Sequence, residues 1–189
     1  MTEPSTSIAE ALAAVVLPHG VTLRALTVAD APLIVELNDA AYPAVPITPA
    51  EEMAALLEHS DCAVALERES AIVALLITLP PGRAYASENY VWFSQRGTDF
   101  RYVDRIVVAE SERGTGLGAL LYGLVMDVAR REGRAEVTCE VNLDPPNPGS
   151  MAFHGRMGFD EVGTQPTKGG AVTVALLAAP VGRHEAGAA

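Results

Sequence analysis

A glycine-rich segment between a strand-like run and a helix-like run restricts the fold of this sequence more than any other feature. The segment Arg113–Gly118 reads RGTGLG. Residues 102–108 before it are rich in β-branched and aromatic side chains, and apolar residues recur after it at helical spacing as far as Val128. A glycine turn that opens a helix presents unpaired backbone N–H groups, and the helix dipole adds about half a positive charge there. The segment therefore predicts an anion site, and a pyrophosphate suits it best.

Length and charge narrow the class of protein. At 189 residues the chain is long enough for one domain with a full core and short for two. The formal net charge of −11 argues against a nucleic-acid binder or a binder of anionic membranes, both of which need a basic surface. We therefore expect no nucleic-acid and no membrane partner, and the acidity slightly favours a small cationic partner.

The cysteines and the apolar runs indicate a compartment. Cys62 and Cys139 lie in apolar stretches without metal-ligand spacing, and no secretory leader is recognisable. No apolar run approaches the roughly 20 residues that a membrane span needs. These observations predict a cytoplasmic protein without a metal centre.

The remaining elements follow from periodicity and from turn residues. A tail is expected over 1–20, with one weak helical stretch, and another over 181–189; the domain between them spans 21–180. A loop rich in aromatic residues is expected between Pro80 and Phe100, where Tyr90, Trp92 and Phe93 either line an acceptor pocket or fill the core. Helices are expected from Asp30, from Thr48, from Leu117 to near Gly133, and from Pro148, where Asn147 caps and Gly158 terminates a short helix. Strands are expected over 21–26, 62–66, 71–79, 102–108, 136–141, 159–164 and 171–178.

A dinucleotide site is one alternative interpretation of the glycine segment. Residues 114–119 satisfy the pattern G-x-G-x-x-A, and Glu136 or Glu140 follows about 20 residues later. In a Rossmann turn the first glycine follows the strand almost at once, whereas residues 109–113 intervene here. A dinucleotide-dependent oxidoreductase therefore remains the less favoured alternative.

Two motifs in order resemble those of the GNAT superfamily of N-acetyltransferases, and in particular a bacterial subgroup of predicted acetyltransferases. The first, Arg or Gln followed by x-x-Gly-x-Gly or Ala after a strand, matches the glycine segment. The second, Asn-x-x-(Ala or Ser)-x-x-apolar-Tyr followed by Gly-Phe, matches residues 147–159 except that His154 stands at the tyrosine position. The resemblance covers about residues 21–178. The matching residues are Arg113, Gly116, Gly118, Asn147, Ser150, Phe153, Gly158 and Phe159.

The resemblance implies a fold and a co-substrate. The fold is a single α/β (α+β) domain, the GNAT acyl-CoA N-acyltransferase fold, with a mixed, mostly antiparallel sheet of six to seven strands flanked by about four helices. Acetyl-CoA would bind between the fourth and fifth strands, with its pyrophosphate on the turn, its pantetheine paired to the backbone of Val107 and Val108, and its thioester carbonyl near the Val108 N–H. The implied cofactor-binding residues are Ile106, Val107, Val108, Arg113, Gly114, Thr115, Gly116, Leu117, Gly118, Ala119, Asn147, Ser150 and Phe153.

Acetyl transfer to a primary amine by direct attack would need two proton transfers. The amine arrives as an ammonium, since alkyl amines have a pKa near 10.4. Asp104 is the first candidate for the base and Glu140 the second. Asp104 otherwise forms a salt bridge to Arg105 or Arg101 or lies at a solvated edge, and Glu140 otherwise lies on a solvated strand face. His154 is the candidate donor to the leaving thiolate, or else packs beside the pantetheine or bonds to a carbonyl.

The expected function is therefore an acetyltransferase that uses acetyl-CoA and acts on a small-molecule or protein amine. A sensor that binds CoA or acyl-CoA with little turnover is the main alternative, because the usual tyrosine is replaced. A homodimer is the default expectation for the oligomeric state.

Overall fold

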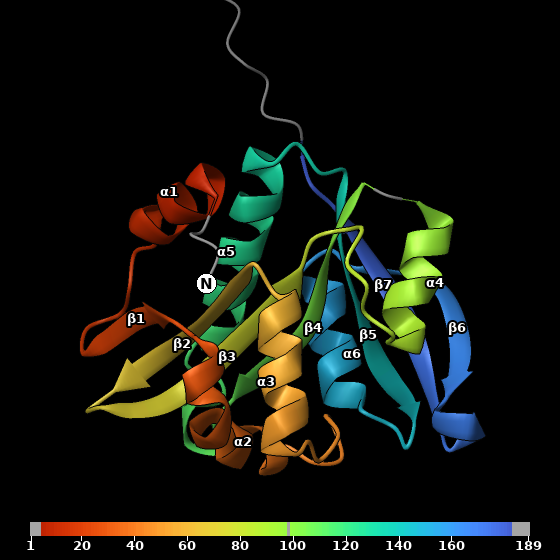
Figure 1. The fold of residues 1–189 in the computed structure, drawn as a ribbon, viewed down its shortest axis with the longest axis horizontal. Coiled ribbons are helices and arrows are strands. Elements are labelled where there is room, and N and C mark those ends of the chain that lie inside the picture. Colours follow the sequence, from red (N-terminus) through yellow and green to blue (C-terminus); the bar gives the residue numbers. More distant parts are fainter. Residues whose placement is uncertain (1–4, 98, 183–189) are drawn as a thin grey trace, which may run out of the picture.

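A seven-stranded mixed sheet organises the protein (Figure 1), and the computed structural model describes residues 5–97 and 99–182. The strand order is β1-β2-β3-β4-β5-β7-β6, and every neighbouring pair is antiparallel except β4 and β5. A Rossmann fold needs successive parallel strands, so this pairing excludes the dinucleotide alternative. The predicted fold class is confirmed. The strands are β1 (Val21–Ala25), β2 (Cys62–Arg68), β3 (Ala71–Leu79), β4 (Phe100–Val108), β5 (Glu136–Asp144), β6 (Asp160–Thr167) and β7 (Val172–Pro180).

Helices cover both faces of the sheet, and each face has its own hydrophobic core. Helices α1, α5 and α6 pack on one face, and α2, α3 and α4 on the other. In Figure 1, α3 lies in front of the sheet and α5 behind it. The helices are α1 (Thr6–Ala14), α2 (Ala31–Asp39), α3 (Ala50–His59), α4 (Glu88–Arg96), α5 (Leu117–Arg131) and α6 (Pro148–Arg156).

The only parallel pair in the described sheet is also where the sheet opens. β4 and β5 pair over three positions, between residues 100–102 and residues 136–138, and no further. Beyond them the two strands diverge, as Figure 1 shows, so the facing edges of both strands lose their partner. This gap between the fourth and fifth strands is where the sequence placed acetyl-CoA.

A β-bulge interrupts β4 at Asp104. On β3, Ile77 and Thr78 are consecutive, yet they pair with Arg105 and Val103, which leaves Asp104 as the extra residue. A bulge shifts the alternation of side chains between the two faces of a sheet. Strict alternation would put Asp104 on one face with Tyr102, Ile106 and Val108; instead Tyr102 lies in the core under α4, whereas Ile106 and Val108 pack on the α5 side.

Two segments differ from the sequence-based expectation. The expected tail contains α1, whose Ile8 and Ala11 are buried in the core on the α5 side, so residues 6–14 belong to the folded domain. The expected loop between Pro80 and Phe100 contains α4. In the expected C-terminal tail, Val181 is buried and its N–H donates to the Ala135 carbonyl at 2.8 Å. Residues 183–189 of that tail lie outside the described part of the chain.

Helix α6 is as predicted. The side-chain oxygen of Asn147 accepts a hydrogen bond from the Ser150 N–H at 3.1 Å, and Pro148 occupies the first helical position. Gly158, with φ of 83°, follows the helix end. Helix α3, expected from Thr48, begins at Ala50, with Pro49 at its N-cap position and no side-chain cap bond.

Gly163 on β6 supports α4 and carries our first prediction. A Cβ atom there would lie 2.7 Å from Cζ2 of Trp92, too close for any real contact. We expect Gly163→Ala to displace Trp92 and to lower the unfolding free energy by about 1–3 kcal/mol. Thermal unfolding measures this as a fall in Tm of roughly 3–10 °C.

The matched control is Gly123→Ala, in α5, where a Cβ meets no atom within 4 Å. Removing a helical glycine should raise stability by about 0.5–1 kcal/mol. A Gly163→Ala protein that melts at the wild-type temperature would show that Trp92 does not depend on this glycine.

Candidate active site

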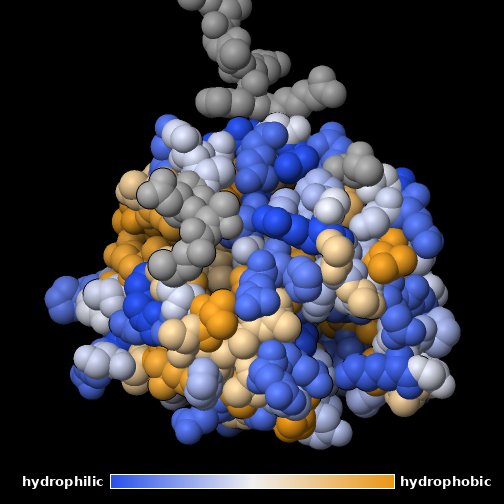
Figure 2. Space-filling model, in the orientation of Figure 1, coloured by the Kyte–Doolittle hydropathy of each residue, from blue (hydrophilic) through white to orange (hydrophobic). Residues whose placement is uncertain are grey.

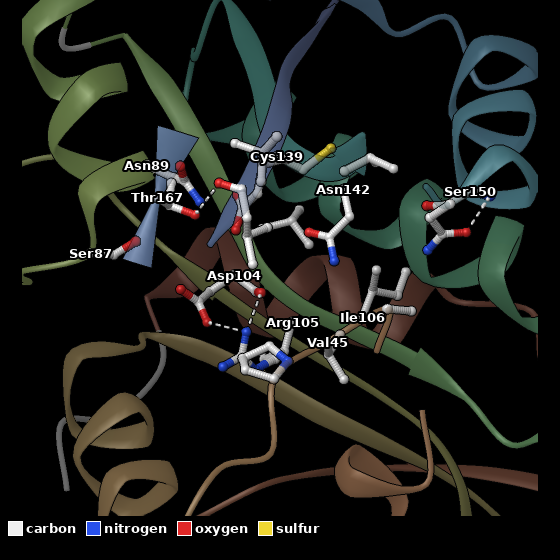
Figure 3. Close-up of a pocket in the computed structure, with 18 of the residues that line it drawn as sticks. Val45, Ser87, Asn89, Asp104, Arg105, Ile106, Cys139, Asn142, Ser150 and Thr167 are labelled. Carbon is white, nitrogen blue, oxygen red and sulfur yellow. Dashed lines mark hydrogen bonds and ion pairs between the residues drawn. The ribbon is translucent and has the colours of Figure 1, made fainter. Parts of the chain in front are cut away.

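A cavity of about 630 Å³ opens at the gap between β4 and β5. One part of its wall comes from the connection between α2 and α3, from the residues before and at the start of α4, and from the central part of β4. The rest comes from the facing part of β5, from the first turns of α6 and from residues of β6 and β7. The surface is hollowed on the face shown in Figure 2, to the right of the centre, with hydrophobic side chains inside and hydrophilic ones around it. Figure 3 shows residues of the cavity wall.

The glycine turn forms a separate feature at the N-terminus of α5. Gly114 and Gly116 have φ of 80° and 92°, a region that side chains disfavour, and a Cβ at either would meet nothing within 4 Å. Gly116 is the N-cap and makes no side-chain cap bond, and the first turn of α5 holds no acidic residue. The first N–H groups of α5 are therefore free to bind an anion.

The charges beside the turn suit a diphosphate. Arg113 is exposed and forms no ion pair within the described residues, whereas Glu112 is held by Arg68 at 2.9 Å. Gly118 allows close packing between α5 and α6, because a Cβ there would lie only 3.4 Å from Cζ of Phe153. The predicted binding residues Gly118 and Phe153 thus bring α5 and α6 together.

The open edge of β4 can bind an extended chain. The Ala109 N–H donates to the Val73 carbonyl on β3 at 2.8 Å. Successive residues of a strand direct their backbone groups to opposite sides, so Ile106 and Val108 direct theirs toward the gap, and Val107 directs its own toward β3. Of the three residues expected to contact the pantetheine, Ile106 and Val108 therefore have backbone groups facing the gap, whereas those of Val107 face β3.

Two carboxylates of the cavity wall, Glu140 and Asp104, are each hydrogen-bonded to a tyrosine. The Tyr102 hydroxyl donates to Glu140 Oε2 at 2.7 Å, and the Tyr85 hydroxyl donates to Asp104 Oδ1 at 2.7 Å. Arg105 lies beside Asp104, with 3.5 Å between Nη1 and Oδ2 (Figure 3). Both tyrosines have a pKa raised by burial, so they stay protonated and donate.

Glu140 is the carboxylate with the properties of a base. Burial, and secondarily the charge of Asp104, raise its pKa from 4.5 to about 7, against hydrogen bonds that lower it. A base is most effective when its pKa lies near the working pH. The structure therefore favours Glu140 over Asp104, the reverse of the order expected from the sequence, because Glu140 has the raised pKa and Asp104 faces Arg105.

His154 is buried and paired with a tyrosine of α5. Its Nδ1 lies 2.7 Å from the Ser150 carbonyl, which can only accept, so Nδ1 carries the hydrogen. Its Nε2, 2.6 Å from the Tyr122 hydroxyl, then accepts. Burial lowers the pKa of His154, which disfavours the protonated form that a proton donor needs. This geometry fits a histidine bonded to a carbonyl better than a proton donor.

The aromatic residues of the 80–100 segment divide between core and cavity. Tyr90 and Phe93 are buried, which confirms the core-filling interpretation for both, and Trp92 covers Gly163. The cavity is lined instead by Tyr85, which the sequence analysis did not single out as a site residue. Arg105 and Tyr122 were also missed; a charged pair, Asp104 and Arg105, inside a β-branched strand was the available signal.

The described residues contain neither a candidate metal cluster nor a candidate membrane-spanning helix. Residues 5–97 and 99–182 contain no group of three or more His, Cys, Asp or Glu side chains that could hold a metal ion. Within the same part of the chain, no helix has the length and hydrophobicity to cross a bilayer.

A sheet that parts between two parallel strands, with an uncapped glycine-opened helix beside the gap, is the arrangement that the motif resemblance implies for a CoA-dependent acyltransferase. Comparison with protein families agrees. The chain belongs to the acetyltransferase (GNAT) family, whose model matches residues 31–159. The protein is thus an N-acetyltransferase of a family that uses acetyl-CoA.

Solved structures show the same fold at low identity. A ribosomal-protein-alanine N-acetyltransferase from Brucella melitensis is 22% identical, with 84% of this chain and 99% of that chain covered and a TM-score of 0.62. A putative acetyltransferase from Salmonella typhimurium with its cofactor acetyl-CoA is 19% identical, with 89% and 98% covered and a TM-score of 0.64. Ard1 from Thermoplasma volcanium is 13% identical, with 87% and 99% covered and a TM-score of 0.69. A comparison with curated protein sequences finds no match.

Proposed function

We propose that the protein transfers the acetyl group of acetyl-CoA to a primary amine by direct attack, with Glu140 as the general base. The observation that carries this proposal is a carboxylate with a pKa of about 7 on the wall of the gap between β4 and β5. The acceptor is a small-molecule or protein amine.

Glu140 would remove the proton that prevents attack. Near neutral pH about half of this carboxyl is ionised, because its pKa is about 7. The ionised form accepts a proton from the ammonium group, and the neutral amine then attacks the thioester carbon. The Tyr102 hydroxyl, 2.7 Å from Oε2, orients the carboxylate during this step.

The backbone of β4 would stabilise the charge that develops on the thioester oxygen. The Val108 N–H is directed toward the gap and has no strand partner there. A fixed N–H donor in a site that excludes water stabilises an oxyanion strongly, since it needs no reorganisation. Asn147 and Ser150, on the cavity wall at the start of α6, would contact the pantetheine arm.

Binding of acetyl-CoA at the glycine turn gives the second prediction. Arg113→Glu places a negative charge beside the diphosphate and should raise the Kd of acetyl-CoA about 10- to 100-fold, the effect of losing a charged hydrogen bond. Isothermal titration at fixed ionic strength measures it. Arg83→Glu, another exposed arginine outside every ion pair of the described residues, makes the same charge change and should leave the Kd unaltered. Equal affinity for wild type and Arg113→Glu would remove the turn from the binding site.

A thiol-release assay with acetyl-CoA and a panel of primary amines tests the activity itself. Release that depends on the amine supports the proposal. Tight binding of acetyl-CoA without release for any amine would indicate the sensor instead.

We also propose that the protein works in the cytoplasm. Both cysteines, Cys62 and Cys139, are free thiols in the core, and burial raises the pKa of Cys62 to about 11. Such thiols are unreactive and suit a reducing compartment. Fractionation of cells that produce the protein tests this placement.

A further inference from the structure

Arg105 is a partly buried cation without short hydrogen bonds. Its side chain is 13% exposed. Its contacts are long: 3.4 Å to the Asp104 carbonyl, 3.5 Å to Asp104 Oδ2 and 3.4 Å to Thr48 Oγ1. Its buried Nε has no acceptor among the described residues. Charged hydrogen bonds are normally about 2.7–2.9 Å long, and a buried charge without them is costly.

Another arginine of β4 shows what a satisfied guanidinium looks like in this protein. Arg101 is fully buried and bonds to Asp61 at 2.8 and 3.1 Å, to Thr78 at 2.7 Å and to Glu132 at 2.8 and 3.3 Å. Arg101 is therefore a structural cation. Arg105, four residues further along β4, lines the cavity and has an Nε donor without an acceptor among the described residues.

The position of Arg105 makes those donors accessible to a ligand. It lines the main cavity and also an adjoining one of about 330 Å³. Because of the bulge, Asp104 and Arg105 lie together on the cavity wall although they are consecutive in a strand (Figure 3). Glu140 lines the same cavity from β5, so the guanidinium and both carboxylates border one space.

We propose that the acceptor is a small amino acid-like zwitterion, whose carboxylate binds Arg105 while its ammonium group faces Glu140 and Asp104. The planar guanidinium fork matches a carboxylate in two parallel hydrogen bonds. This inference rests on the proposed function and narrows its acceptor class. The N-terminus of a peptide is a different case, because its first residue carries an amide where an amino acid carries a carboxylate.

Matched acceptor pairs test the proposal. The pairs are L-alanine with ethylamine, L-phenylalanine with 2-phenylethylamine, and 4-aminobutyrate with propylamine, each assayed by thiol release from acetyl-CoA. We expect the amino acid of at least one pair to have a kcat/KM about 10- to 100-fold above that of its amine, the effect of one charged interaction. A tripeptide with an N-terminal alanine is assayed beside them.

Variants of Arg105 separate recognition from structure. Arg105→Gln should remove the advantage of the amino acid, with a loss of about 10- to 100-fold for the amino acid and little change for its amine. Arg105→Lys retains the charge without the fork and should restore part of the advantage. Arg83→Gln, at an exposed position, is the control, and the Tm of each variant verifies folding.

The outcomes separate the two proposals. If amines or the tripeptide are acetylated and no amino acid is preferred, the zwitterion inference is wrong and the acetyltransferase stands. If Arg105→Gln lowers kcat/KM equally for the amino acid and for its amine, Arg105 is structural and the inference is wrong. If no acceptor in the panel releases thiol from acetyl-CoA, both proposals are contradicted for these acceptors.

Discussion

Replacing Glu140 with glutamine is expected to lower kcat by about 10²- to 10⁴-fold, the usual contribution of a general base, with little change in the Kd of acetyl-CoA. The substitution preserves the shape of the side chain and removes its ability to accept a proton. The Tyr102 hydroxyl, now 2.7 Å from Oε2, can still donate to the amide oxygen, so the local structure should persist.

The pH dependence makes this prediction specific. Ionised Glu140 is the active form, so activity should rise with pH and reach half of its plateau near the pKa of about 7. At lower pH the rate should fall roughly tenfold per pH unit as the base is protonated. Glu140→Gln should lose this acid limb, and a limb that persists unchanged in the variant would assign the base elsewhere.

Asp104→Asn is the matched comparison, because it also replaces a carboxylate by an amide, at the other candidate base. The charge of Asp104 is one cause of the raised pKa of Glu140. Its removal should therefore shift the acid limb to lower pH while a limb remains. If Asp104→Asn abolishes the limb and Glu140→Gln only shifts it, Asp104 is the base, as the sequence first indicated.

Arg101→Met is expected to produce the largest loss of stability. Arg101 is fully buried and holds Asp61, before β2, and Glu132, after α5, to the start of β4. Removing one member of a buried ionic group typically costs about 3–5 kcal/mol, because the remaining charges are left unpaired. Asp61 and Glu132 are 24% and 12% exposed, so water relieves part of this cost, and we expect the lower end of the range.

Thermal unfolding should show this loss as a fall in Tm of roughly 6–15 °C. Arg96→Met is the control: it breaks the ion pair with Glu136, but the Arg96 side chain is 37% exposed, so the loss should be at most about 1 kcal/mol. Arg101 precedes the point at which β4 and β5 part, so its loss should also weaken acetyl-CoA binding. Similar melting temperatures for the two variants would show that the Arg101 cluster contributes no more than a surface pair.

Local signals in the sequence were sufficient for most strands and for the turns beside the cofactor site. The β-branched run at 102–108, the glycines at 114 and 116 and the Asn147-Pro148 pair each act on their own backbone within a few residues. Helix α4 was missed because its surroundings are polar and rich in turn residues, and its helical state depends on burying Tyr90 and Phe93 against β4. The packing of α1 on the α5 side of the sheet was missed because it also depends on tertiary burial, here of Ile8 and Ala11.

The sequence by itself determined the family motifs, the anion-binding turn and the identity of the acidic candidates. Only the tertiary structure ranks the two acids as candidate bases, since the pKa of Glu140 depends on Tyr102 and Asp104, which come from another strand. It also decided that Asp104 and Arg105 share one wall, through a register shift against β3 that strict alternation does not predict. Backbone preferences act between neighbours in the chain, whereas burial and electrostatic fields are set by groups that folding brings together from distant positions.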